Sequence, residues 1–260
     1  MLFEGLGPTS GFMRLNVFLQ RAGVGSRREA ERLVAAGVVT VDGVVASVTT
    51  QVEDGSVVAV DGKVVGIEEA PLPRIFKYHK PVGVIITARD HEGRKTLYDA
   101  LAEMKDYAKL PRLMPVGRLD LNSEGLLLLT TDGGLAQTLM SPKTALKREY
   151  HVRVFGELTE IQLNQFRKGV TIEGVWYRGA EVELLKVGES QRNRWYRVVL
   201  TEGKNREIRR IFNFFNCEVN RLLRVQYGPF TLDDMPKSAL AEVSAREVEA
   251  LLKELGRDES

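Results

Sequence analysis

The sequence predicts an α+β protein in which a small amino-terminal module of two helices and a small β-sheet precedes a larger domain with a mixed, largely antiparallel sheet. Apolar residues recur at helical spacing near the start and are followed by short β-branched runs. From residue 74 onward, strand patterns alternate with amphipathic helical ones. No glycine-rich phosphate loop follows a strand, which disfavours a doubly wound parallel sheet.

The composition is that of a globular chain. With 260 residues, 43% of them hydrophobic and 28% charged, the chain can bury a core in one or two domains. The single cysteine, Cys217, cannot form an internal disulfide and lies between apolar residues, so we expect it to be buried in a cytoplasmic protein. No apolar run reaches the length of a membrane span, and the three histidines lack zinc-type spacing, so we expect neither membrane nor metal.

The amino-terminal module begins with two helical segments. Apolar residues recur at helical spacing from Leu15 to Ala22, and SRREAERLVAAG predicts a second helix. In that segment Ser26 and Glu29 have the spacing of a capping box, and Gly37 supplies the stop. The runs VVTVDGVVA and VVAVDGKVV then predict short strands, each with an Asp-Gly turn.

The charges of this module are segregated. Residues 14–36 contain five arginines and two glutamates. A solvated helix face would explain one basic helix, but a polarised module of two helices and hairpin strands favours phosphate binding. The candidate contacts are Arg14, Arg21, Arg27, Arg28 and Arg32.

The larger domain alternates between strands and helices. RIFKYHKPVGVIIT predicts a strand, a Lys-Pro turn and a second strand. Residues 126–130 predict a fully apolar strand, and residues 134–140 a helix. LKREYHVRVFG alternates strictly, with Tyr150, Val152 and Val154 on one face. An amphipathic helix in ELTEIQLNQFRKGV and a strand in WYRVVLTEG follow.

The segment EGKNREIRRIFNFFN predicts a helix that begins at Asn205. Its apolar residues repeat at core spacing from Ile208 to Phe215, and Arg206, Arg209 and Arg210 flank that stripe. Three arginines near a helix start oppose the helix dipole unless an anion is close. An RNA phosphate or a fixed carboxylate would supply that anion.

Arg118 and Asp120 lie two positions apart in MPVGRLDLNSEGLLLLTTDG, just before the apolar strand, so in an extended chain we expect both side chains on one face. A structural ion pair is the simplest interpretation of the local sequence. A carboxylate beside arginines also suits a nucleophile or a base. A hydrolase pair of Asp120 with Asp132 is a third reading, but Asp132 in TDGG is better explained as a turn residue.

Two stretches resemble known families. LQRAGVGSRREAERLVAAGVVTVDG resembles the ribosomal-protein-four-type RNA-binding domain. VGRLDLNSEGLLLLTTDG resembles the signature of the RsuA/RluB family of bacterial ribosomal RNA pseudouridine synthases, and YHKPVGV, LKREYHVRV, TEGKNREIRR and RLLRVQYG match in order. The RluB branch, which acts on large-subunit RNA, is most similar through EGRKTLYDAL and TEGKNREIRR; His79 departs from the asparagine usual before Lys-Pro.

The resemblance implies an isomerase that converts uridine to pseudouridine in ribosomal RNA, most similar to the enzymes of 23S RNA. The target base must be flipped out of the RNA stack, and no cofactor is needed. A small-subunit 16S RNA substrate and a noncatalytic RNA-binding assembly factor are the alternatives. We expect a cytoplasmic monomer whose partner is ribosomal RNA, either free or in a pre-ribosomal particle.

The resemblance also implies roles for single residues. Asp120 is the catalytic carboxylate, which either attacks carbon 1′ of the sugar or removes a proton from carbon 2′. Tyr150 stacks under the flipped base, and Arg209 pairs with Asp120 and keeps it anionic. Arg118 contacts the RNA backbone. Leu222 or Leu223 lines the pocket, with plain core packing as the alternative for a leucine in a strand. Further RNA contacts are expected from Lys204, Arg206 and Arg210.

These expectations divide the chain into five parts. Residues 1–12 are a flexible extension and residues 13–65 the RNA-binding domain. A linker covers residues 66–74, the pseudouridine synthase domain residues 75–255, and a tail residues 256–260.

Overall fold

The computed structural model describes residues 12–53, 55–66, 72–87, 90–188 and 192–256. The chain forms two compact units, Met1–Pro71 and Leu72–Ser260, which are treated separately below. Nearly all of the expected extension and tail, and residues 67–71 of the expected linker, lie outside the described residues. Arg74, which was assigned to the linker, pairs with Glu242 and is therefore part of the larger unit.

The small unit contains the two predicted helices, α1 (Leu15–Arg21) and α2 (Arg27–Ala35). The Ser26 side chain accepts a hydrogen bond from the Glu29 N–H, as the capping pattern predicts, and Gly37 follows the helix with φ +71°. The apolar faces of both helices pack on the following strands. This core consists of Leu15, Phe18, Leu19, Ala30, Val34, Val39, Ala46, Val52 and Val58.

Both predicted hairpins of the small unit are present. Strands β2 (Val39–Val41) and β3 (Val44–Val45) flank one Asp-Gly turn, and β5 (Val58–Val60) and β6 (Lys63–Val65) flank the other. All four turn residues have positive φ, as the tight hairpin turn requires. The sheet order is β3-β2-β5-β6. A second, short pair, β1 (Met13–Arg14) with β4 (Gln51–Val52), was not predicted.

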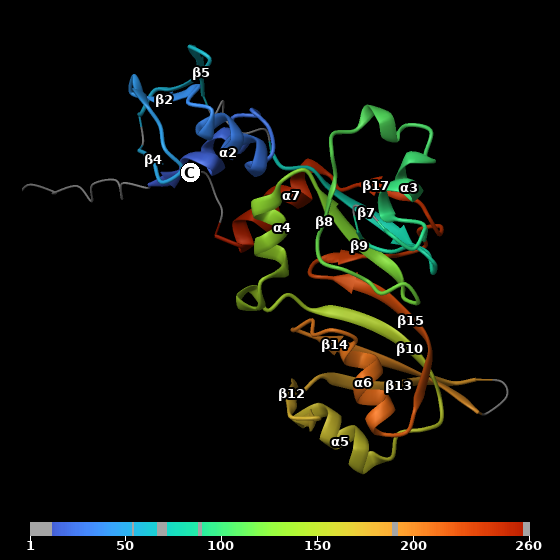
Figure 1. Cartoon of the computed structure of the whole chain (residues 1–260). Helices are drawn as coiled ribbons and strands as arrows, with labels where there is room; N and C mark the ends of the chain where they lie inside the picture. The colour runs from blue at the N-terminus through green and yellow to red at the C-terminus, as the bar shows by residue number, and fades with distance from the viewer. Residues whose placement is uncertain (1–11, 54, 67–71, 88–89, 189–191, 257–260) are drawn as a thin grey trace, which may run out of the picture. The chain divides into compact units, whose positions relative to one another are not determined.

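The larger unit is built on a nine-stranded sheet with the order β13-β14-β10-β15-β9-β7-β17, to which β16 and β8 attach (Figure 1). The only parallel pair among the described strands is β15 with β9, so the predicted mixed, largely antiparallel sheet is confirmed. The strands of this sheet are β7 (Ile75–Lys80), β8 (Met114–Pro115), β9 (Glu124–Thr130), β10 (Arg148–Phe155), β13 (Glu181–Val187), β14 (Asn193–Leu200), β15 (Glu218–Tyr227), β16 (Phe230–Thr231) and β17 (Leu240–Glu242).

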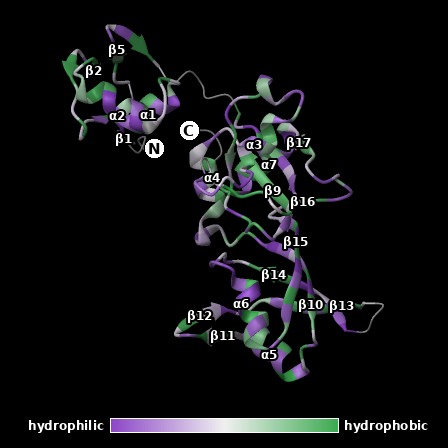
Figure 2. Ribbon diagram, turned by 45° about the vertical axis from the view of Figure 1, so that its right-hand side comes forward, coloured by the Kyte–Doolittle hydropathy of each residue, from purple (hydrophilic) through white to green (hydrophobic). Residues whose placement is uncertain are grey.

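Helices cover the sheet and set its burial pattern. The helices α5 (Glu160–Lys168) and α6 (Glu207–Phe214) bury one face of strands β10, β13, β14 and β15. Both helices carry hydrophilic as well as hydrophobic residues (Figure 2). A second core lies between β9 and the helices α4 (Gly133–Met140) and α7 (Ala245–Glu254). The remaining elements are α3 (Leu97–Ala102), the short 3-10 turns Tyr107–Lys109 and Pro142–Thr144, and the hairpin β11 (Gly169–Ile172) with β12 (Val175–Arg178).

Three local predictions for this unit need adjustment. The second strand expected after the Lys-Pro turn is wrong, because residues 84–87 form only an isolated bridge from Ile85 to Thr96. The apolar strand begins two residues early, at Glu124, and is buried throughout. The helix expected at Asn205 begins at Glu207, because Arg206 has a left-handed backbone with φ +51°. Cys217 is buried, as expected.

Gly125 joins the two halves of the sheet. It pairs with Lys80 of β7 on one side and with Arg224 of β15 on the other. At this point the backbones approach so closely that a β-carbon on Gly125 would lie 2.2 Å from the Arg224 carbonyl oxygen. Its φ of +108° also disfavours any other residue. The close approach of β9 and β15 therefore requires a glycine.

We expect Gly125→Ala to lower the free energy of unfolding by roughly 3 kcal/mol or more, since it adds a backbone clash to an unfavourable backbone conformation. Gly203→Ala is the matched control, because nothing lies within 4 Å of the added carbon. Urea denaturation of both variants measures the difference. An equal, small effect of the two substitutions would contradict the close approach.

Candidate active site

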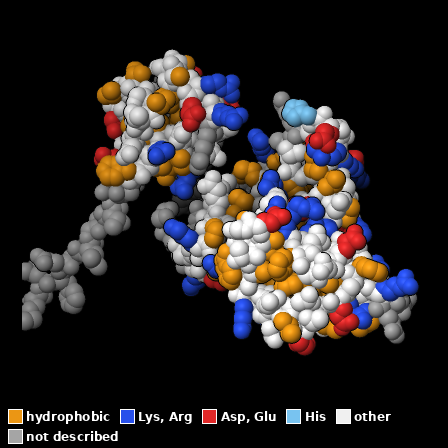
Figure 3. All heavy atoms as spheres, turned by 60° about the horizontal axis from the view of Figure 1, so that its bottom comes forward, with side chains coloured by type: hydrophobic (Ala, Val, Ile, Leu, Met, Phe, Trp, Pro, Cys, Tyr) orange, Lys and Arg blue, Asp and Glu red, His pale blue; other side chains and the backbone are white. Residues whose placement is uncertain are grey.

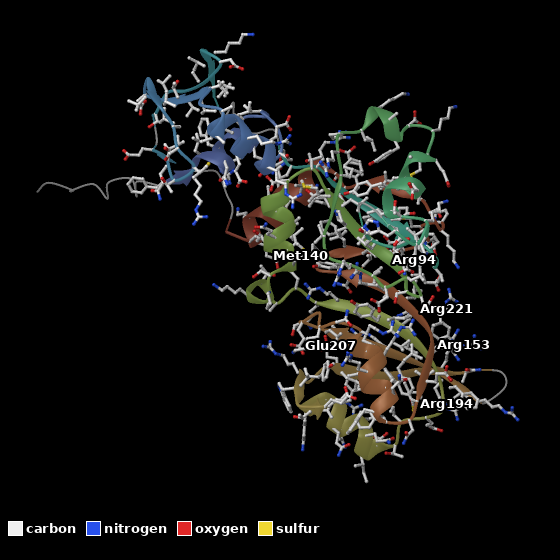
Figure 4. All side chains as sticks on the ribbon, viewed as in Figure 1. Arg94, Met140, Arg153, Arg194, Glu207 and Arg221 are labelled. Carbon is white, nitrogen blue, oxygen red and sulfur yellow. The ribbon has the colours of Figure 1, made fainter. Side chains whose placement is uncertain are left out.

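A cavity of about 560 Å³ lies in the larger unit, within the size range of small-molecule sites. Its walls come from segments far apart in the sequence: the loop before β9, the buried faces of β10 and β15, and the turn between β14 and α6. In Figure 4, Glu207 at the start of α6 marks the last of these walls. Met140, labelled at the end of α4, also lines the cavity. Of the predicted site residues, the cavity is lined by Arg118, Asp120, Tyr150, Lys204, Arg206 and Leu222.

Arg118 and Asp120 lie in a loop rather than in a strand. Leu119 between them is buried, while both charged residues line the cavity, so the pair shares a face as the i, i+2 spacing predicts. The Asp120 side chain is 33% exposed, and its Oδ2 lies 3.7 Å from Nη1 of Arg206. The carboxylate is thus accessible from the cavity and has a cation beside it.

Lys80 stabilises this loop through hydrogen bonds to its backbone. It is fully buried, and its Nζ donates hydrogen bonds to the carbonyl oxygens of Asp120 (3.1 Å), Ser123 (2.8 Å) and Pro81 (2.9 Å). Burial lowers the pKa of the Lys80 ammonium to about 8, although the nearby Asp120 carboxylate acts in the opposite direction. A buried lysine therefore fixes the backbone of Asp120.

Arg209, on α6, also bonds to the backbone of this loop. Its Nη2 donates to the carbonyl oxygen of Asn122 (2.7 Å), and its Nη1 to that of Val219 (2.8 Å). The predicted direct pairing of Arg209 with Asp120 is therefore wrong in this structure, where Arg206 is the ion-pair partner. Burial, followed by the nearby Arg206, lowers the pKa of Arg209, while Asp120 raises it. Arg209 acts on Asp120 through the loop backbone and at longer range.

Tyr150 and Leu222 form an apolar wall of the cavity. They lie on the neighbouring strands β10 and β15 and are 8% and 7% exposed. Both also belong to the main core cluster, so packing and pocket lining coincide at these positions. No hydrogen bond from the Tyr150 hydroxyl group is found within the described part of the chain.

Two buried arginines lie close to the ring of Tyr227 in the wall of the cavity. The guanidinium carbons of Arg148 and Arg224 lie 4.7 and 5.1 Å from the centre of the tyrosine ring. Arg148 also donates to the Tyr227 hydroxyl (2.9 Å), and Nε of Arg224 donates to the carbonyl oxygen of Leu126 (2.7 Å). This part of the wall is therefore cationic and rigidly held. Arg148 lies on the same buried face of β10 as Tyr150.

The turn between β14 and α6 contributes two carboxyl groups, Glu202 and Glu207. Glu207 is 3% exposed. Burial and the neighbouring Glu202 raise the pKa of Glu207 to about 8, while the pKa of Glu202 is lowered by its bonds to Lys204 and Arg178. The anion that the arginine-rich helix start requires is supplied by carboxylates: Asp120 faces Arg206, and Glu173 lies 3.8 Å from Arg210.

The remaining basic candidates lie outside the cavity. Arg210 is exposed on α6. In the small unit Arg14, Arg21, Arg28 and Arg32 are exposed, and none forms an ion pair within the described residues; the Arg27 side chain lies outside them. In Figure 3 lysine and arginine side chains gather near the middle of the visible face of the larger unit.

Other candidates do not form sites. Asp132 caps α4 by accepting a hydrogen bond from the Leu135 N–H, so its structural interpretation is confirmed. His79 bonds to the carbonyl oxygen of Met235, and His151 lies 3.5 Å from Glu149. Among the described residues, no group of three or more His, Cys, Asp or Glu could hold a metal, and no helix is long and apolar enough to cross a membrane.

Several residues that line the cavity were not predicted as site residues, namely Arg148, Glu202, Glu207, Arg224 and Tyr227, nor was Lys80, which bonds to the loop that carries Asp120. The sequence motifs YHKPVGV, TEGKNREIRR and RLLRVQYG contain most of them.

Comparison with known proteins agrees with this geometry. Residues 74–214 match the RNA pseudouridylate synthase family, and residues 13–58 match the S4 domain. The chain is 44% identical to an RNA pseudouridine synthase of Rickettsia felis over 91% of this chain and 99% of the relative. It is 41% identical to the ribosomal large subunit pseudouridine synthase B of Vibrio vulnificus, over 92% of this chain and 74% of that protein.

A solved structure shares the fold. A crystal structure of a pseudouridylate synthase superposes with a TM-score of 0.62 at 22% identity, covering 92% of this chain and 99% of that one. The family match covers more than half of the chain, and the resemblance read from the motifs is confirmed. The chain belongs to the RNA pseudouridylate synthase family of isomerases, and within it to the RsuA/RluB type.

Proposed function

We propose that this protein converts a specific uridine of large-subunit ribosomal RNA to pseudouridine, with Asp120 as the catalytic residue. The observation that carries the proposal is the placement of the Asp120 carboxylate in the cavity wall beside Arg206, on a loop whose carbonyl groups bond to Lys80 and Arg209. The large subunit is favoured over the small one because the Vibrio vulnificus relative, named for the large subunit, is 41% identical over 92% of the chain.

The reaction needs a carboxylate and a pocket for one base. The bond from N1 of the uracil to carbon 1′ breaks, the ring rotates, and carbon 5 bonds to carbon 1′. Carbon 5 loses its proton and N1 gains one, so the product is an isomer of the substrate. Asp120 can act by attack on carbon 1′ or by removing a proton from carbon 2′, and both routes use the same carboxylate.

The cavity provides for each part of the flipped nucleotide. The Tyr150 ring, with Leu222 beside it, offers an apolar surface on which the base stacks. Arg118, Lys204 and Arg206 are exposed at the rim, where the charged RNA backbone passes. Flipping costs a few kcal/mol, which these contacts offset.

The small unit adds affinity for RNA. Its exposed arginines without carboxylate partners suit phosphate contacts, and its S4 domain match supports the same role. Mapping pseudouridines in large- and small-subunit RNA from cells with and without this gene tests the substrate. Loss of a single large-subunit pseudouridine is the expected result, and loss confined to the small subunit would contradict the proposal.

Asp120→Asn should lower the rate of isomerisation by at least about 10³-fold while RNA affinity changes only a few-fold, because the reactive carboxylate is lost with little change in volume. Release of tritium from RNA labelled at uracil carbon 5 measures the rate. Asp132→Asn is the matched control, since an asparagine still caps α4. Substantial turnover by Asp120→Asn would remove this residue from the catalytic role.

Tyr150→Phe should bind RNA as tightly as the unaltered protein, whereas Tyr150→Ala should bind less tightly by about 1–3 kcal/mol, the worth of stacking on an aromatic ring. The hydroxyl group has no hydrogen-bond partner among the described residues, so phenylalanine keeps the packing. Affinities for the same RNA measure this. Equal binding by folded Phe and Ala variants would assign Tyr150 to the core alone.

The fragment 72–260 should fold and retain chemistry on saturating RNA, because the cavity lies wholly within the larger unit. Its RNA affinity should fall, and the slope of log affinity against log salt should flatten by about 0.7–0.9 for each lost phosphate contact. The full chain with Arg21, Arg28 and Arg32 replaced by Gln should show the same trend. Unchanged affinity and slope in both proteins would mean that these arginines form only a solvated surface.

A further inference from the structure

Two adjacent carboxyl groups, Glu202 and Glu207, form part of the cavity wall but have no role in the chemistry described above. Glu207 is the first residue of α6 and is almost wholly buried, at 3% exposure. The Glu202 side chain is 15% exposed and lies within hydrogen-bonding reach of Glu207. Two ionised carboxylates in such a position would repel each other.

The hydrogen bonds of the pair account for three of its four oxygens. Oε1 of Glu202 accepts from the Arg178 N–H (2.8 Å), and Oε2 of Glu202 pairs with the Lys204 ammonium. Oε2 of Glu207 accepts from the Lys204 N–H (2.9 Å). Oε1 of Glu207 is buried and has no donor among the described residues. A single proton held by Glu207 would let the two carboxyl groups bond to each other instead of repelling.

The side chain of Glu207 also closes the turn that carries Arg206. The Glu207 N–H donates to the Lys204 carbonyl (3.3 Å), while the Glu207 carboxyl group accepts from the Lys204 N–H. Between them, Arg206 has the left-handed backbone conformation that a residue with a β-carbon rarely adopts. This conformation places Nη1 of Arg206 3.7 Å from Asp120. The position of the Arg206 side chain therefore depends on the conformation of this turn, which the hydrogen bonds of Glu207 stabilise.

We propose that Glu202 and Glu207 share one proton and that this pair positions Arg206 against Asp120, so that Glu207 is a positioning residue for the proposed isomerisation. The inference rests on the proposed function. When the shared proton is lost, the two carboxylates repel, the turn from Lys204 to Glu207 loosens, and Arg206 leaves Asp120.

The pH dependence follows from the raised pKa of Glu207, about 8, whose largest cause is burial and whose second is Glu202. An acid with a raised pKa holds its proton below that pH, so the ordered turn is present below pH 8 and is lost above it. The other charged groups that face the pair are Lys204 in the turn, whose ammonium lies 5.8 Å from the Tyr177 ring of β12, and Arg206. Arg178 contributes a backbone N–H.

The test compares single-turnover rates at pH 7 and pH 9 for the full-length protein and its Glu207→Gln, Glu207→Ala and Glu160→Gln variants. The substrate is transcribed large-subunit ribosomal RNA labelled at uracil carbon 5. Glutamine accepts from the Lys204 N–H and donates to Glu202 at every pH. Its rate at pH 7 should lie within about threefold of that of the unaltered protein. Between pH 7 and pH 9 its rate should fall less than that of the unaltered protein, in which only about a tenth of Glu207 remains protonated at pH 9. The fall that remains in this variant belongs to other groups, such as Lys80, whose pKa is also about 8.

Glu160, exposed on α5, is the matched control. Its glutamine variant makes the same chemical change on the surface and leaves Glu202 and Glu207 as they are. The unaltered protein and Glu160→Gln should both fall about tenfold between pH 7 and pH 9. The Glu207→Ala variant should react slowly at both pH values. The protein concentration that gives half of its maximal single-turnover rate should be nearly unchanged. A fall in Glu207→Gln equal to that of Glu160→Gln would overturn the shared proton. No isomerisation by the unaltered protein at pH 7 would instead overturn the proposed function.

Discussion

The position of Asp120 depends on two cations that bond to the backbone of its loop from opposite sides. Lys80, in β7, binds the carbonyl oxygens of Asp120 and Ser123, and Arg209, in α6, binds that of Asn122. Backbone carbonyls are neutral acceptors, so the cations fix the loop without neutralising the carboxylate that faces the cavity. The side chain of Asp120 keeps an accessible surface and has Arg206 as its ion-pair partner, 3.7 Å away.

This anchoring places charge inside the protein, and the surrounding fold compensates for it. Burial, together with the nearby Arg224, lowers the pKa of Lys80, whereas Asp120 and Glu124 oppose that effect. On the other wall, α6 serves both structure and site: its apolar stripe fills the main core, and its first turn presents Arg206 and Glu207 to the cavity. The described residues that line the cavity all belong to the larger unit, and the small unit carries exposed arginines without carboxylate partners among the described residues. Under the proposed function, the chemistry and part of the RNA affinity therefore come from different units of the chain.

The sequence by itself determined the features that depend on short-range patterns. Period-two and period-3.6 spacing predicted the strand from Arg148 to Phe155 and the core stripe of α6. Asp-Gly pairs predicted the two hairpin turns, and the spacing of Arg118 and Asp120 predicted that both face one side. The ordered motifs identified the family. Residue identity and spacing suffice here because the physical cause lies within a few residues of the chain.

Only the tertiary structure decided which groups meet. Arg206 and Arg209 follow Asp120 by 86 and 89 positions in the sequence, and their distances to it depend on how α6 docks on the sheet. The left-handed Arg206, the buried Lys80 and the adjacent Glu202 and Glu207 likewise arise where β7, β9 and α6 converge. The reason is physical: burial, and with it the pKa of a charged group, is set by neighbours brought together from distant segments, and spacing along the chain carries no measure of that distance.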